Sequence, residues 1–194
     1  MERLRARLKR LLGRFFYTMV GWSMEPLPQY PGEKFVVVCF PHTSFLDGCL
    51  AFASMAALGR EGNIIVKQEA FKGPLGLLLR LLGGIPVERG SSGALVSRMV
   101  REFRRRNRFF LGITPEGTRG RVDRLKSGFW HIAKQAEVPI LCWYIDQEAH
   151  RTRWLGLVHP GDDIDEDLRS IRFIYEAAGC AWPSGPLPPA PVSP

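Results

Sequence analysis

A histidine and an aspartate, placed five residues apart, form the first pattern in this sequence that could perform chemistry. His42 and Asp47 stand in the segment Pro41-His-Thr-Ser-Phe-Leu-Asp47, directly after an apolar run. An imidazole transfers protons near neutral pH, and a carboxylate on its far nitrogen would orient the ring and stabilise its protonated form. The spacing puts the two side chains on different faces of a regular helix, so they can meet only if His42 precedes the helix. In the structural alternative, Ser44 caps the helix with Asp47 as its capping-box partner, and His42 is an ordinary loop residue.

A second polar segment, Thr114-Pro-Glu-Gly-Thr-Arg119, follows another apolar run. It gathers a carboxylate, a glycine and a guanidinium at the end of an expected strand. Arginine suits bidentate recognition of phosphate, and glycine lets a ligand approach the backbone closely. The segment alone also fits a plain surface turn. Two such segments at strand ends favour a functional interpretation of both.

Short β-branched runs bounded by turn residues indicate strands, and apolar residues at steps of three and four indicate helices. Strands are expected over 34–40, 63–66, 85–88, 109–113, 138–145 and 154–158, and helices over 44–58, 75–82, 94–106, 129–136 and about 162–178. This alternation predicts an α/β fold, a single domain with a largely parallel central sheet flanked by helices. In sheets of this type, reactive groups lie at the carboxyl ends of the strands, in the loops that lead to the following helices.

The same segments resemble the motifs of a known enzyme family. His42-Thr-Ser-Phe-Leu-Asp47 resembles the H-x-x-x-x-D motif of the glycerolipid acyltransferases, the family of 1-acylglycerol-3-phosphate acyltransferases. Pro115-Glu-Gly-Thr-Arg119 looks like their P-E-G-T-R motif. Gly84-Ile-Pro-Val-Glu-Arg89 is similar to their G-x-x-x-x-R block, and Val138-Pro-Ile140 to their V-P-I strand. These blocks stand in family order over about residues 34–145, and the joint match is far more specific than any one of them.

The resemblance implies transfer of a fatty acyl group from acyl-CoA or acyl-carrier protein to a lysophospholipid-type acceptor in phospholipid biosynthesis, lysophosphatidic acid above all. By analogy, His42 would deprotonate the acceptor hydroxyl as it attacks the thioester carbonyl, and Asp47 would orient His42. A thioester needs no metal, so no metal and no cofactor beyond the acyl donor are expected.

The resemblance also suggests which residues hold the acceptor. Arg89, Glu116, Gly117 and Arg119 match positions associated with it, and Arg119 is the principal candidate for a phosphate contact. Lys67, at the start of a stretch similar to the family's K-x-x-L-x-x-x-P block, and Lys126 are weaker phosphate candidates.

The sequence departs from the family pattern at Ala70, which replaces the Leu of the K-x-x-L-x-x-x-P block, and at one position beside each of the two main motifs. Many relatives carry Asn before the catalytic His, where this chain has Pro41, and Ser after the motif's Arg, where it has Gly120. The proton chemistry is unaffected, but the acceptor stays open between lysophosphatidic acid, glycerol 3-phosphate and lyso-lipids built on an amine or a sugar. The leucine-rich run at 75–82 fits either a core helix or the lining of an acyl-chain tunnel.

Residues 1–24 are expected to form a basic amphipathic helix, with apolar residues from Leu4 to Val20 at helical spacing. Its apolar face could dock on the core or insert into a lipid headgroup layer, and both alternatives stay open. Residues 33–180 would form the acyltransferase domain, and residues 181–194 a Pro-rich tail that is disordered or extended. The chain has neither a signal-peptide pattern nor the ~20 apolar residues of a membrane span. We therefore expect a cytoplasmic protein, peripheral on the inner face of the cell membrane.

The chain carries 27 Lys and Arg against 19 Asp and Glu, a net charge of +8 that favours anionic partners such as a phospholipid surface. A cluster of arginines at 101–108 could suggest nucleic acid, but no nucleic-acid fold motif accompanies it, so no nucleic-acid partner is expected. The four cysteines lack zinc-site or disulfide-scaffold spacing and are expected to be reduced. Serine hydrolysis and nucleotide hydrolysis are disfavoured because their signature loops are missing. The alternative outside the enzymes is a membrane-associated lipid-binding protein that has the acyltransferase fold but does not catalyse the reaction.

Overall fold

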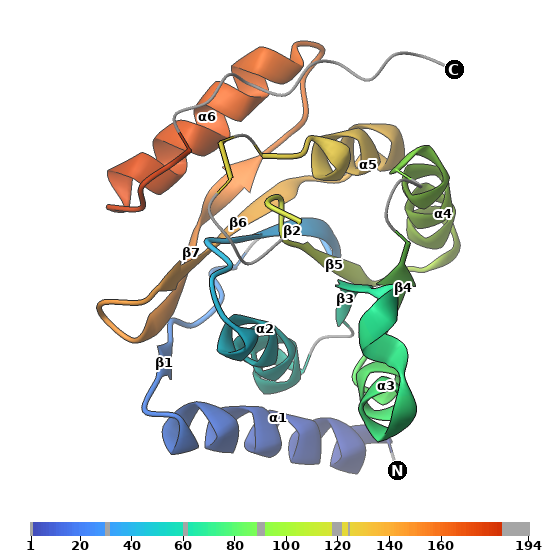
Figure 1. Ribbon diagram of the computed structural model, residues 1–194, viewed down its shortest axis with the longest axis vertical. Helices are drawn as coiled ribbons and strands as arrows, with labels where there is room; N and C mark the ends of the chain where they lie inside the picture. Colours follow the sequence, from blue (N-terminus) through green and yellow to red (C-terminus); the bar gives the residue numbers. More distant parts are fainter. Residues whose placement is uncertain are drawn as a thin grey trace.

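The computed structural model describes residues 2–29, 32–59, 62–88, 92–117, 122–123 and 125–183 (Figure 1). Its strands are β1 (Ser23–Met24), β2 (Lys34–Phe40), β3 (Gly62–Lys67), β4 (Gly84–Val87), β5 (Phe109–Ile113), β6 (Ile140–Asp146) and β7 (Arg151–Val158). Its helices are α1 (Glu2–Met19), α2 (Phe45–Leu58), α3 (Gly73–Leu81), α4 (Ser92–Arg105), α5 (Gly128–Ala136) and α6 (Ile164–Ala177), with the 3-10 helix η1 (Gln68–Phe71) before α3. Every helix and strand expected within residues 33–180 forms, with ends that differ by no more than three residues. Of the expected tail, residues 184–194 lie outside the described residues.

The sheet has seven strands in the order β1-β7-β6-β2-β5-β3-β4. Strands β6, β2, β5, β3 and β4 run parallel to one another, which confirms the largely parallel sheet. Strand β7 is antiparallel to β6, to which a short turn joins it, and β1 adds two residues at the edge of β7. The sequence patterns did not predict β1 or the reversed direction of β7.

Helices cover both faces of the sheet (Figure 1). The connections between parallel strands put α2 and α3 on one face, with α1 outside α2, and α4 and α5 on the other face, as the general rule of right-handed crossovers predicts for this strand order. Side chains of α6 join the core on the face of α4 and α5. Strand β2 shows the effect of this double cover. Its Val36 and Val38 point into one core cluster, and its Phe35 and Val37 into the other, so the strand is one continuous apolar run.

Helix α1 docks on α2 through Gly13 and Tyr17, which the apolar pattern did not single out, and Phe16 and Val20 of that pattern pack against the same core cluster. A Cβ placed on Gly13 would lie 2.5 Å from the backbone nitrogen of Ala57, so only glycine allows this approach. One turn further on, the buried Tyr17 hydroxyl lies 2.6 Å from Ser54 Oγ and 2.9 Å from Thr152 Oγ1. These contacts make α1 part of the folded domain.

The opposite side of α1 carries most of the apolar residues that were expected to be buried. We call it the outer stripe, and its side chains are between 55% and 72% exposed. The outer stripe consists of Leu4, Leu8, Leu11, Leu12, Phe15 and Met19. Of the two alternatives left open for the apolar face, core docking does not apply to these six residues, because the Gly13 side of α1 packs on α2 and these side chains are exposed.

The leucines of the second run are also exposed. In α3 only Gly76 and Leu79 are buried, so the expectation of a core helix there is wrong for most of its leucines. Among the described residues, no helix is both long enough and apolar enough to cross a membrane. The four cysteines are unpaired, and three of them are buried.

Candidate active site

Polar residues gather at one edge of the sheet because four parallel strands end there. His42 follows β2, Glu116 follows β5, Gln147 follows β6 and Lys67 is the last residue of β3. The strand order β6-β2-β5-β3 makes these strands consecutive neighbours. The carboxyl edge of the sheet therefore brings together segments that lie far apart in the sequence, as expected for an open α/β sheet.

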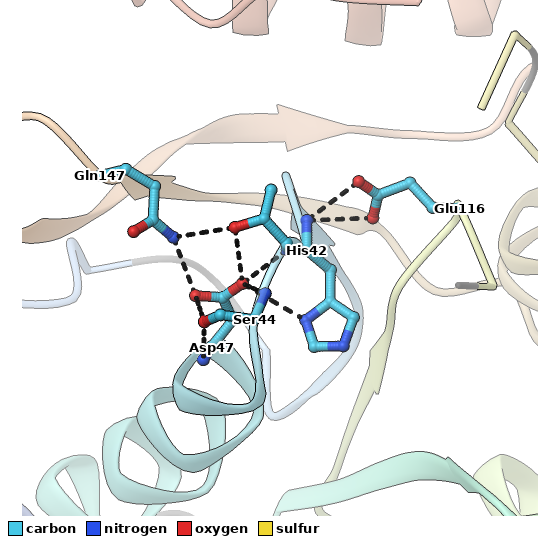
Figure 2. A network of polar contacts seen from close by, with 6 residues as sticks. His42, Ser44, Asp47, Glu116 and Gln147 are labelled. Carbon is cyan, nitrogen blue, oxygen red and sulfur yellow. Dashed lines mark hydrogen bonds and ion pairs between the residues drawn. The ribbon is translucent and has the colours of Figure 1, made fainter. Parts of the chain in front are cut away.

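His42 lies in the loop between β2 and α2, after a cis peptide bond between Phe40 and Pro41. Its Nδ1 is 3.7 Å from Oδ2 of Asp47, and the Asp47 residue is only 1% exposed. The two side chains meet because His42 precedes the helix, which is the condition that their spacing imposed. With Nδ1 toward Asp47, Nε2 is the nitrogen on the far side of the ring (Figure 2).

The structural alternative for these residues is also realised. Ser44 caps α2, its Oγ accepts the Asp47 N–H at 3.3 Å, and the Asp47 carboxylate accepts the Ser44 N–H at 2.7 Å. The capping box and the His42 pair share one carboxylate, so the two interpretations do not exclude each other. The cap places Asp47 where it can face His42.

Further donors hold the Asp47 carboxylate in place (Figure 2). Oδ2 accepts the backbone N–H of Thr43 at 2.6 Å, in addition to that of Ser44. Oδ1 accepts the Ser44 hydroxyl at 2.9 Å and the side-chain amide of Gln147 at 2.8 Å. Donors on both oxygens fix the plane of the carboxylate, and with it the oxygen that faces His42.

Gln147 is a site residue that the sequence interpretation missed. It reaches Asp47 from the turn after β6, 100 residues further along the chain. Its position in the sequence could have identified it. Gln147 directly follows β6, the strand that begins in the V-P-I block, and β6 pairs with β2. A polar residue at that place faces the His42 loop.

Glu116 supports the same loop from the other side. Its two carboxylate oxygens lie 2.9 and 3.1 Å from the backbone nitrogen of His42, whose N–H they accept. The residue is 7% exposed, and burial raises its pKa to about 7; the Asp47 charge acts in the same direction and the His42 hydrogen bond opposes it. The family resemblance assigned Glu116 to the acceptor, whereas this geometry attaches it to the backbone of His42.

Gly117 and Lys126 lie against each other beside this carboxylate. Gly117 has a φ of +63°, and its N–H donates to the Thr114 carbonyl at 3.1 Å, closing a tight turn. The positive φ favours glycine in this turn, and the Lys126 Nζ lies only 2.7 Å from where a Cβ on Gly117 would stand. The Lys126 ammonium thus lies over the turn at Gly117, the residue that follows Glu116.

Two of the expected acceptor residues, Arg89 and Arg119, lie outside the described residues. Lys67 is half-buried at the end of β3, on the same edge as His42. Within the described ranges, no three His, Cys, Asp or Glu side chains are grouped so that they could hold a metal ion.

Comparisons with known proteins agree with the motifs. Residues 23–146 match the acyltransferase family, a range that includes His42, Asp47, Glu116 and Gly117. The fold is similar to that of the 1-acyl-sn-glycerophosphate (LPA) acyltransferase PlsC from Thermotoga maritima, with a TM-score of 0.60 and 20% identity. That likeness covers 93% of this chain and 82% of the other. A search of curated proteins found no match. Because the family match extends over more than half of its length, the chain belongs to the acyltransferase family.

Proposed function

We propose that this acyltransferase moves a fatty acyl group from a thioester of CoA or acyl-carrier protein to a hydroxyl of a lysophospholipid-type acceptor, with lysophosphatidic acid as the first candidate. The observation that carries the proposal is the pairing of His42 Nδ1 with Asp47 Oδ2 at 3.7 Å at the carboxyl edge of the sheet. The similar structure from Thermotoga maritima is that of an LPA acyltransferase, which supports the choice of lysophosphatidic acid.

In the proposed mechanism, His42 is the general base. Its Nε2 takes the proton of the acceptor hydroxyl while the oxygen attacks the thioester carbonyl, forming a tetrahedral intermediate. Collapse of the intermediate breaks the carbon–sulfur bond, and the imidazolium returns its proton to the departing thiolate. Asp47 stabilises the imidazolium between these steps through its charge at Nδ1. The products are the acylated acceptor and the free thiol, so the reaction needs no further reactant.

Cationic side chains at the same edge are proposed to hold the acceptor's phosphate. Lys126 lies over the Gly117 turn, and Lys67 ends the strand next to β5. Arg89 and Arg119 complete the proposed set by their places in the family motifs. Glu116 does not compete for these cations in the described contacts, because it is buried against the His42 backbone.

We also propose that the enzyme is peripheral on the inner face of the cell membrane and attaches through the outer stripe of α1. The stripe presents leucine, phenylalanine and methionine to solvent, and Arg7 and Arg14 lie between it and the packed face. Apolar insertion together with about 1 kcal/mol for each basic residue near an anionic surface gives reversible attachment.

His42→Ala tests the chemistry. We expect kcat to fall by roughly 10²–10⁴-fold with the melting temperature unchanged, because the general base is lost. The matched control is His159→Ala, an exposed histidine after β7, which should leave kcat unchanged. Turnover near the wild-type rate in folded His42→Ala would remove the base from the mechanism. A wild-type protein that cleaves no acyl thioester would instead favour lipid binding without turnover.

Arg119→Lys tests the phosphate contact. The variant keeps a positive charge but loses the planar fork, so KM for a phosphate-bearing acceptor should rise while KM for the acyl donor stays the same. Comparing lysophosphatidic acid with a lyso-lipid built on an amine or a sugar identifies the acceptor. A change confined to the donor's KM would assign Arg119 to the donor site.

Deleting α1 cannot test membrane attachment, because the deletion would also remove the Gly13 and Tyr17 contacts with α2. The combined variant Leu8→Glu and Phe15→Glu changes only exposed positions. It should lose flotation with anionic vesicles and keep both its melting temperature and its activity on dispersed short-chain substrate. Unchanged flotation would move the membrane contact away from α1.

A further inference from the structure

Helix α3 carries an exposed apolar surface that neither the core nor the catalytic pair uses. Four leucines of this nine-residue helix and the C-cap Leu82 are between 43% and 74% exposed. We call this surface the leucine face, and it consists of Leu75, Leu77, Leu78, Leu81 and Leu82. At 100° per residue, these positions span an arc of about 160°, and the buried Gly76 and Leu79 lie outside it. Continuous apolar surfaces of this kind mark interaction sites.

The position of α3 connects the catalytic edge with α1. The helix starts just after Lys67 and η1, at the carboxyl edge of the sheet, and runs back along the same face as α2. At its far end, a Cβ on Gly83 would lie 2.5 Å from the Gly62 carbonyl oxygen, beside the end of α2. Arg10 of α1 covers Gly59 at that same end of α2. Helices α1 and α3 therefore both lie on the face of the sheet that α2 covers, and each has contacts near the same end of α2 (Figure 1).

We propose that the leucine face is a second membrane contact, which inserts into the acyl-chain region of the same anionic lipid monolayer as the outer stripe. This inference rests on the membrane attachment in the proposed function, and it extends that attachment from α1 to the helix beside the active site.

The charges around α3 support a lipid surface as the occupant. The helix contains no acidic residue, and exposed Lys72 and Arg80 stand near its two ends. The Arg80 guanidinium lies 5.3 Å from the centre of the Phe71 ring, outside the leucine arc. Basic side chains bordering a leucine surface complement anionic headgroups above an apolar layer.

The composition of the leucine face argues against a second copy of the chain as the occupant. Its arc contains leucine and Pro74 and offers no polar side chain, whereas protein interfaces carry about one hydrogen bond per 100–200 Å² to fix their register. A lipid monolayer needs no such partner. Insertion of α3 would also bring the monolayer to the edge that carries Lys67, so a lyso-lipid acceptor could keep its chain in the membrane while its head reaches the site.

The test changes the leucine face without touching the core or the site. Leu77→Glu with Leu81→Glu alters two residues that are 62% and 74% exposed. We expect partition onto phosphatidylcholine–phosphatidylglycerol vesicles to fall at least about tenfold, because two charges would have to leave water. Melting temperature and activity on water-dispersed short-chain substrate should not change. The matched control is Phe173→Glu, at a 72% exposed position of α6 on the other side of the sheet, which should bind vesicles like the wild type.

A probe at the leucine face supplies a second measurement. An NBD fluorophore on Leu81→Cys, in a Cys49→Ser background, should shift its emission to shorter wavelength when the same vesicles are added. Unchanged emission with vesicles bound, or wild-type vesicle binding by the leucine-face variant, would overturn the proposal. If the α1 variant alone loses binding, the proposed function stands without α3. A wild-type protein that binds no vesicles would overturn both membrane proposals, and a dimer that the leucine-face variant dissociates would assign the surface to a second copy.

Discussion

Asp47→Asn removes one charge from the site and keeps the shape of the side chain, so its effect on turnover can be worked from the geometry. His42 Nδ1 and Asp47 Oδ2 are 3.7 Å apart. When His42 takes up the hydroxyl proton, the resulting ion pair is worth about 4 kcal/mol at an effective dielectric constant of about 20. Because about 1.4 kcal/mol corresponds to a factor of ten in rate, kcat should fall by up to about 10³-fold.

The same substitution should also lower stability. An ionised carboxylate makes hydrogen bonds of roughly 1.5–3 kcal/mol, against roughly 0.5–1.5 kcal/mol for a neutral amide. Asp47 accepts the N–H groups of Thr43 and Ser44 and the side-chain donors of Ser44 and Gln147. The two ranges differ by about 1–1.5 kcal/mol for each bond, so four weakened bonds should cost about 4–6 kcal/mol of unfolding free energy. The kcat must therefore be measured below the lowered melting temperature.

Release of the free thiol at saturating donor and acceptor measures kcat, and urea unfolding measures stability. The matched control is Asp163→Asn, which changes the N-cap of α6, where the carboxylate accepts the Asp165 N–H at 2.8 Å. The control should lose at most about 1 kcal/mol, through the charge at the helix N-terminus, because asparagine caps a helix about as well as aspartate, and it should keep kcat. A folded Asp47→Asn protein whose kcat lies within tenfold of the wild-type value would refute the electrostatic role of Asp47.

Three further expectations concern the supports of the catalytic pair and of α1. Gln147→Leu removes one donor from Asp47 Oδ1 but keeps the charge, so kcat should fall about tenfold with little change in the acceptor's KM; no change in steady-state kinetics would make Gln147 dispensable. Burial raises the pKa of Glu116 from its ordinary 4.5 to about 7. Between these two pH values the folded state binds more protons than the unfolded state, so the free energy of unfolding falls as the pH rises. Glu116→Gln should flatten this dependence by at most about 3 kcal/mol in urea titrations at pH 4.5 and pH 7, and parallel curves would contradict the assignment. Tyr17→Phe leaves two buried hydroxyls without their partner and should cost about 1–3 kcal/mol of unfolding free energy, whereas Thr18→Ala, at an exposed position, should cost little.

The strands that could be predicted from sequence are those whose burial produces a recognisable run of apolar residues. Strand β2 is buried on both faces and forms a continuous apolar run, so its bounds were predicted without error. Strand β1 consists of Ser23 and Met24 alone and pairs only with two residues of β7, which is too short to give a period. The antiparallel direction of β7 could not be predicted from its composition, because side-chain alternation is the same in both directions.

The contact between His42 and Asp47 was predictable because both belong to one local segment, and a loop before a helix is the only geometry that lets them meet. Gln147 was not predictable in this way, since its partner lies 100 residues away and a single glutamine forms no motif. The packed face of α1 was predicted only in part, through Phe16 and Val20, for a different reason. Leucines dominate an apolar pattern, whereas close helix packing here depends on Gly13, which contributes no apolar side chain.

The capping box of α2 makes the contact between His42 and Asp47, the pair proposed to be catalytic, depend on local unfolding. Asp47 holds its place through the first turn of the helix, and its bonds to Thr43 and Ser44 order the loop that carries His42. Helix ends open more readily than the core of a domain, because fewer contacts must break. Opening of this one turn would separate the base from its carboxylate while the sheet stays folded. Heat should therefore inactivate the enzyme reversibly below the global melting temperature. Mutations that stabilise α5 or α6 should raise the melting temperature but not the lower temperature at which activity is lost.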